Sequence, residues 1–159
     1  MKRLIPPLTM MVSAALLPGC GGGGAGSDPP PASQVTLTVR ALGTPATLYS
    51  VQFKMPLPAG VTLATLPSGE VAPGVVVASA GTSAAGMVAT CNRTATPQTL
   101  SVALISGDGF PAGDMVRVTV SAPIAAPVQA GSFVFSEFAA YADFAGAVAP
   151  GVSGSVSIP

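Results

Sequence analysis

Two aspartates, Asp108 and Asp114, are spaced so that a turn could bring their carboxylates together. Gly109, Pro111 and Gly113 lie between them and favour such a turn. The simplest interpretation is a loop with two solvated aspartates. The alternative is a weak calcium site, because carboxylate and backbone carbonyl oxygens in loops suit that cation.

The chain has 159 residues and no histidine. A Ser-His-Asp triad, a Cys-His dyad and a zinc site with histidine ligands therefore cannot form from it. Its two cysteines make no Cys-x-x-Cys pair, so the usual redox and haem-attachment motifs are missing as well. We expect a protein that is not an enzyme and that holds no cofactor.

One of the cysteines, Cys91, lies in a run where side chains facing inward and outward should alternate. The alternation places Met87, Ala89 and Cys91 on the same face of a strand. We expect Cys91 to be buried and unpaired, because a free cysteine behaves as a small hydrophobic residue. An intermolecular disulfide in an oxidising compartment is the alternative.

The other cysteine, Cys20, follows a segment with the three parts of a secretory signal over residues 1–19. Lys2 and Arg3 form the basic part, the stretch 4–17 is apolar, and a small glycine precedes the cysteine. The run Leu-Pro-Gly-Cys at 17–20 resembles the lipobox of bacterial lipoproteins. An uncleaved hydrophobic N-terminus, or a plain secretory cut that leaves Cys20 free, are the other interpretations of the segment.

The lipoprotein resemblance implies that the chain is cut before Cys20. The thiol would then form a thioether to diacylglycerol, and the new amino group would be acylated. Two or more buried acyl chains hold a protein stably to a membrane. In this family an aspartate after the cysteine tends to retain the protein at the inner membrane, and Gly21 stands there instead. The resemblance therefore implies lipid anchoring in the cell envelope, at the outer membrane.

Residues 20–33 contain the candidate lipidated cysteine and a linker. The stretch 21–33 has no residue able to build a core: its first half is rich in glycine, and its second half contains Pro-Pro-Pro. After Cys20, four basic side chains face six acidic ones, a net charge of −2. The basic residues are scattered singly, so we do not expect nucleic acid as a partner.

The remaining residues, 34–159, are expected to form one domain rich in β-strands. Helix-favouring Glu, Lys and Gln are rare, and short alternating runs end at Gly, Pro or Asp. No apolar run reaches the roughly 18–20 residues of a membrane-spanning helix. About nine or ten strands packed as a two-sheet, jelly-roll-like sandwich are expected. The predicted strands span 35–40, 49–54, 61–66, 75–79, 87–93, 99–106, 115–122, 132–136, 141–144 and 152–158.

The order of these features resembles the cohesin-like domains. The resemblance lies in the run YSVQFKMPLPAGV at 49–61, the paired strands within TLSVALISGDGFPAGDMVRVTV at 99–120, and the late strands from 133 to 156. It implies a non-catalytic module that binds another protein. No residue can be matched to the dockerin-binding surface of cohesins. The alternative is a carbohydrate-binding module for envelope or extracellular polysaccharide, against which the shortage of aromatic residues counts.

Aromatic residues are densest between Ser132 and Phe144. Phe133 and Phe135 share a face at a spacing of two and are expected in the core. Phe138 and Tyr141 follow in a possible connection and are the candidate contact surface. Tyr49 is predicted to face inward with the other odd-numbered residues of its strand, and so to lie in the core.

Overall fold

The protein is described here by a computed structural model of residues 31–44 and 47–159. Cys20 and the predicted signal segment lie outside these residues. The described part contains eight strands and two short 3-10 helices. Their bounds are β1 Ala32–Thr44, β2 Thr47–Pro56, β3 Val76–Ala78, η1 Ala80–Thr82, β4 Gly86–Asn92, β5 Thr99–Pro111, β6 Gly113–Pro123, η2 Ala130–Ser132, β7 Glu137–Tyr141 and β8 Gly151–Ser157.

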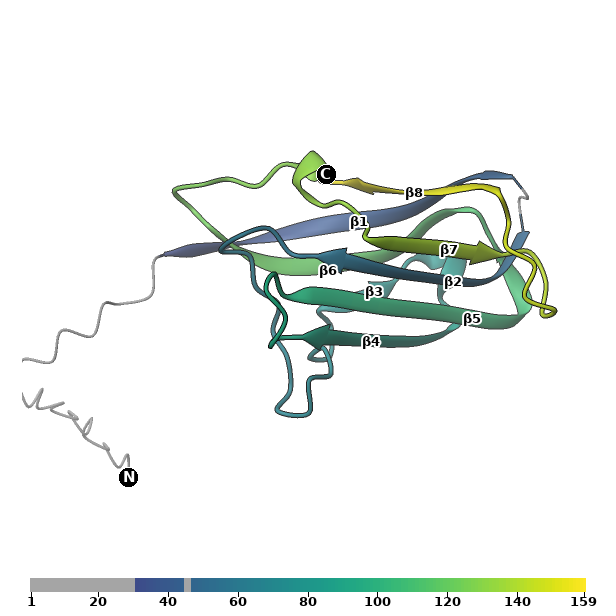
Figure 1. Cartoon of the computed structure of the whole chain (residues 1–159), viewed down its shortest axis with the longest axis horizontal. Coiled ribbons are helices and arrows are strands. Elements are labelled where there is room, and N and C mark those ends of the chain that lie inside the picture. Colours follow the sequence, from purple (N-terminus) through teal and green to yellow (C-terminus); the bar gives the residue numbers. More distant parts are fainter. Residues whose placement is uncertain (1–30, 45–46) are drawn as a thin grey trace, which may run out of the picture.

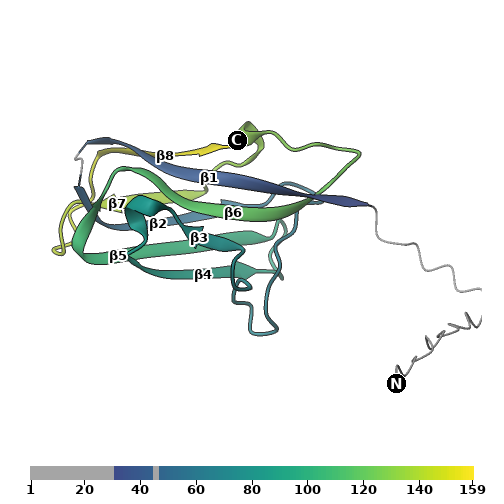
Figure 2. The same ribbon diagram turned by 180° about the vertical axis from the view of Figure 1, so that it is seen from behind.

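The strands form two antiparallel sheets that pack face to face (Figure 1). One sheet has the order β4-β5-β2-β7, and it is called the groove sheet because its outer face carries a groove. The other sheet has the order β3-β6-β1-β8 and is called the opposite sheet. The view from behind shows the same two layers, with β8 along one margin of the molecule (Figure 2). The prediction of an all-β sandwich is confirmed.

The described residues form eight strands where about nine or ten were expected, and two of the predicted strands do not exist. The stretch 61–66 follows a proline turn and makes only single bridges, Thr62 to Ser121 and Thr65 to Val71. In the stretch 132–136, η2 takes the first residue and no ladder follows. Alternation of apolar residues alone did not reveal that these segments lack a partner strand along their length.

A third predicted strand, 141–144, is displaced. The strand β7 ends at Tyr141 because the chain turns directly after it: the Asp143 carboxylate accepts a hydrogen bond from the Ala147 amide at 3.0 Å. At the other end of the domain, β1 begins at Ala32, two residues before the expected start of the domain and three before the expected strand. Ala32 and Ser33, assigned above to the linker, pair with Pro123 and Ala122 of β6.

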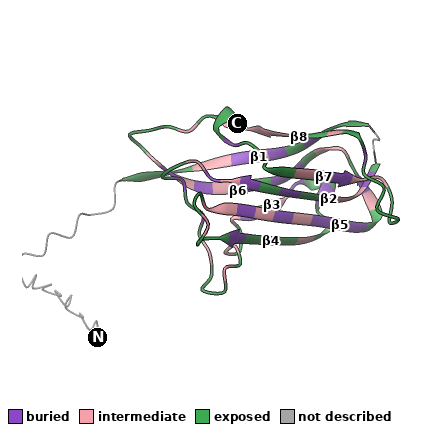
Figure 3. Cartoon of the chain, in the orientation of Figure 1, coloured by how far each residue is buried: buried purple, intermediate pink, exposed green. Residues whose placement is uncertain are grey.

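The core lies between the sheets and is built by alternation along each strand. Purple residues alternate with pink or green ones along the central strands β5, β2 and β6 (Figure 3). Burying one large aliphatic side chain contributes about 1.5–3 kcal/mol, so this layer supplies most of the stability. Its largest fully buried members are Leu37, Leu48, Met55, Leu100, Leu104, Met115, Val39, Val51, Val116, Val118 and Val120.

The position of Tyr49 corrects a prediction. Leu48 of β2 pairs with Phe110 of β5, but Ser50 pairs with Ile105, so four residues of β5 bulge out opposite Tyr49. This irregularity resets the alternation. Leu48 is buried in place of Tyr49, which is half-buried and packs on exposed Phe144 with ring centroids 4.9 Å apart.

Among the described residues, no helix is long and apolar enough to cross a membrane.

Candidate functional site

The outer face of the groove sheet is a grid of side chains set by the strand register. Directly paired residues of neighbouring strands point to the same side of a sheet. One row across the four strands is polar, and the next consists mainly of small or aliphatic side chains. The polar row is Thr90, Ser101, Lys54 and Glu137; the middle row is Val88, Ala103, Gln52 and Ala139.

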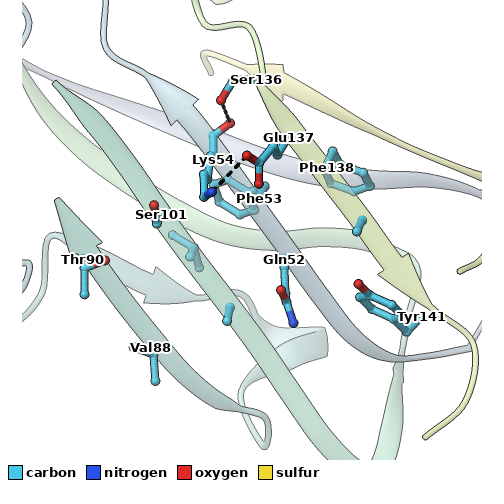
Figure 4. Close-up of a pocket in the computed structure, with 13 residues that line it drawn as sticks. Gln52, Phe53, Lys54, Val88, Thr90, Ser101, Ser136, Glu137, Phe138 and Tyr141 are labelled. Carbon is cyan, nitrogen blue, oxygen red and sulfur yellow. Dashed lines mark hydrogen bonds and ion pairs between the residues drawn. The ribbon is translucent and has the colours of Figure 1, made fainter. Parts of the chain in front are cut away.

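These two rows line a groove of about 690 Å³, which is open to solvent. Figure 4 shows Thr90, Ser101 and the Lys54–Glu137 pair in one row across the strands, with Val88 and Gln52 in the row beside it. Ala103 and Ala139 flank Gln52, whose amide projects from the central strand β2. This middle row forms the floor of the groove. The floor is low because two of its four side chains are alanine.

An ion pair closes the polar side of the groove. The Lys54 ammonium lies 2.9 Å from the Glu137 carboxylate, and these side chains are half or more exposed. The Ser136 hydroxyl donates to the Lys54 carbonyl oxygen at 3.3 Å, beside the pair. Among the residues that the structure describes, Lys54 and Glu137 are the only charged ones that line the groove. Because they neutralise each other, the groove has no net charge and suits a neutral ligand surface.

The structure places Phe138 and Tyr141 on opposite faces of β7. Phe138 pairs with buried Phe53, faces inward, and packs on Phe135 with ring centroids 5.5 Å apart. Tyr141 pairs with Ser50 and faces outward at the end of the groove. Of this predicted pair, only Tyr141 can contribute its side chain to the outer surface. The alternation that separates the two could be applied only once their segment was known to be a strand.

The two aspartates of the possible calcium site lie in different elements. Asp108 is exposed in the bulge of β5, where Gly109 has a φ of 75°. Asp114 lies in β6 on the opposite sheet, and its carboxylate is 2.6 Å from the Arg40 guanidinium. Within residues 31–44 and 47–159, no group of three or more His, Cys, Asp or Glu side chains is placed to hold a metal.

Cys91 is a free cysteine, buried on the inner face of β4, as the alternation predicts. Burial raises the pKa of its thiol above the ordinary value, and the positive charge of Arg93 partly offsets that rise. The thiol is therefore neutral near pH 7 and behaves as part of the core. Cys20 lies outside the described residues, and its modification stays a prediction.

The groove was not predicted from the sequence. The sequence does contain an indication of it, because the outward-facing residues of β5 at positions 101 and 103 are serine and alanine. Small residues on one strand form a groove only when neighbouring strands continue the row, and that depends on register. No protein-family model, curated protein or solved structure matches the chain.

Proposed function

We propose that the protein is a lipid-anchored, non-catalytic interaction module of the bacterial cell envelope, and that it binds another protein through the groove. The low floor at Ala103 and Ala139 is the observation that carries the proposal, because it leaves room for side chains of a partner. The sandwich itself is compatible with the cohesin-like resemblance. The sequence at 17–20 supports the anchor.

The surface chemistry of the groove favours a protein over a polysaccharide. Protein contacts need an apolar centre with polar groups around it, and here small and aliphatic side chains lie beside a row with hydroxyls and an ion pair. Sugar rings are usually held against exposed aromatic rings, and Tyr141 is the one aromatic residue that the strand register places outward at the groove. Polysaccharide binding therefore remains the second candidate.

Filling the groove tests this function. We expect Ala103→Lys to abolish recovery of the partner by cross-linking in the envelope, because a long charged side chain then occupies the floor. The matched control is Thr119→Lys, which places the same side chain on β6, a central strand of the opposite sheet. Equal loss of the partner in both variants, or in neither, would contradict the assignment of the groove.

Glycan arrays and pull-downs with cellulose and peptidoglycan separate the two candidate ligands. A protein-binding module should fail on all of these surfaces and still yield a discrete cross-linked protein in the envelope. Retention on a polysaccharide at micromolar affinity or tighter, lost in Ala103→Lys, would replace the protein partner with a sugar.

The anchor is tested separately at Cys20. We expect Cys20→Ser to abolish labelling with a fatty-acid analogue and to release the protein from membranes, since the thioether cannot form and stable attachment needs at least two chains. Unchanged fractionation of this variant would contradict the lipid anchor, and would leave the binding test on the groove unaffected.

A further inference from the structure

The free edges of the two sheets differ in how they are protected. An unpaired strand edge presents a row of N–H and C=O groups that can pair with another chain, and proteins normally shorten, cover or charge such an edge. Three of the four edge strands follow this rule. The fourth, β8, does not.

Two of the protected edges are covered by nearby backbone. On β4, the Cys91 amide donates to the Gly69 carbonyl and the Ala89 carbonyl accepts from Val71. On β7, the Ala140 carbonyl accepts from Ala149 at 2.8 Å. The third edge strand, β3, is only three residues long. None of these strands offers a long unpaired edge.

The strand β8 has seven residues, GVSGSVS, and pairs with β1 on one side only. It contains no charged residue and no proline. On its outer side, the Val152 amide donates to Ala149, and among the residues the structure describes no other hydrogen bond reaches that edge. Both views show β8 along the margin of the sandwich (Figures 1 and 2).

The groups that point outward from β8 follow from alternation along the strand. Since the Val152 amide points away from β1, the backbone groups of Gly154 and Val156 do so as well. The side chains of Ser153 and Ser155 lie on the solvent face, opposite exposed Leu42 and Arg40 of β1. Apart from the Val152 amide, the outward backbone groups of residues 152–156 are therefore unpaired within the part of the chain that the structure describes.

The sequence of this edge is symmetric about Gly154. Serine lies on each side of the glycine at 153 and 155, and valine lies one step further out at 152 and 156. An antiparallel copy of the strand, centred on Gly154, would therefore place Ser opposite Ser and Val opposite Val. No like charges would meet across such a pair.

We infer that β8 pairs with β8 of a second copy of this chain. In this dimer the Gly154 amides and carbonyls of the two copies exchange hydrogen bonds, and each Val156 amide donates to the partner's Val152 carbonyl. The opposite sheets of the two copies become one continuous sheet. This inference goes beyond the proposed function, because β8 contributes no residue to the groove, and both grooves stay open in the dimer.

The register predicts which cysteine substitutions can be joined. Ser153 lies opposite the partner's Ser155 in a pair without backbone hydrogen bonds, where Cα atoms are about 4.5 Å apart, within the range of about 4.4–6.8 Å for a disulfide. Identical positions lie on the diagonal, roughly 7–8 Å apart. A disulfide should therefore join position 153 to position 155 and not either position to itself.

The test co-expresses two full-length chains with different tags, one carrying Ser153→Cys and the other Ser155→Cys. We expect a disulfide-linked dimer containing both tags after mild oxidation. Each variant expressed alone is the control, because it carries the same Cys20 and Cys91 and one new thiol. The pairing would be overturned if co-expression gave no mixed dimer. It would also be overturned if either variant alone gave an equal yield of disulfide-linked dimer.

A proline variant tests the hydrogen bonds themselves. Val156→Pro, added to both chains, removes an amide that points away from β1. Two hydrogen bonds between copies are lost, and we expect the mixed disulfide to fall about tenfold. Val156→Thr keeps the amide and the branched side chain and should leave the yield unchanged. Equal yields with proline and threonine would contradict the proposed edge pairing.

Discussion

The two sheets have similar inner faces and different outer faces. On the groove sheet, the outward residues Ser101 and Ala103 of β5 and Ala139 of β7 are small, and a groove of about 690 Å³ crosses the strands there. On the opposite sheet, long Arg40 and Arg117 side chains project from the central strands, and the hollow at one end is smaller, about 400 Å³. The inner faces build the sandwich, so the outer faces are free to differ in the size of their side chains.

Core truncations offer the largest effect and test whether the inner faces are equivalent. Leu104 lies on the groove sheet and Leu37 on the opposite sheet, and both are fully buried. We expect Leu104→Ala and Leu37→Ala each to lower the free energy of unfolding by about 2–5 kcal/mol, through lost burial and a cavity. Urea denaturation measures both. A cost near zero in one sheet alone would show that the core is not shared.

A glycine substitution tests how closely the two sheets approach at their β7 and β8 edges. A Cβ atom at Gly154 would overlap the Phe138 ring and lie 2.8 Å from Phe135 Cε2. We expect Gly154→Ala to destabilise the protein by about 1–3 kcal/mol through overpacking, measured by thermal or urea unfolding.

Gly86 on β4 is the control, since a Cβ there would be 3.6 Å from its nearest atom, the Ile105 carbonyl oxygen. Gly86→Ala should change the unfolding free energy by no more than about 0.5 kcal/mol. Equal effects at both glycines would contradict the close contact between β8 and the phenylalanines.

The ion pairs should have the smallest effect, and a similar one on each outer face. Lys54–Glu137 lies on the groove sheet and Arg40–Asp114 on the opposite sheet, both largely exposed. We expect Glu137→Gln and Asp114→Asn each to cost less than about 1 kcal/mol, because solvent screens such pairs. Urea denaturation measures the change in the free energy of unfolding. A much larger loss in either variant would contradict this prediction, because that ion pair would then stabilise the fold more than its exposure predicts.

Part of this architecture could be predicted from the sequence alone. Runs such as 35–40 and 115–122 alternate cleanly and lie in β1 and β6, so the all-β sandwich follows from local pattern. The stretch 61–66 shows a similar pattern and forms no strand, because strand formation also needs a partner along its length. Pairing partners are distant in sequence, and local alternation does not encode them.

The outer surface was harder to predict for the same reason. The bulge in β5 placed Leu48 in the core instead of Tyr49, and the register of β7 separated Phe138 from Tyr141. The groove depends on small residues from β5 and β7 meeting across β2. Each residue type was visible in the sequence, but its neighbours across the sheet were not.

Site-specific photo-cross-linking compares the two outer faces most directly. A photoreactive amino acid at position 103 on the groove sheet, or at position 119 on the opposite sheet, is introduced into the full-length chain and activated in intact cells. We predict one discrete protein adduct from position 103, lost when Ala139→Lys fills the groove, and no such adduct from position 119. The same adducts from both faces, or an adduct at position 103 that persists with Ala139→Lys, would contradict a binding role for the groove.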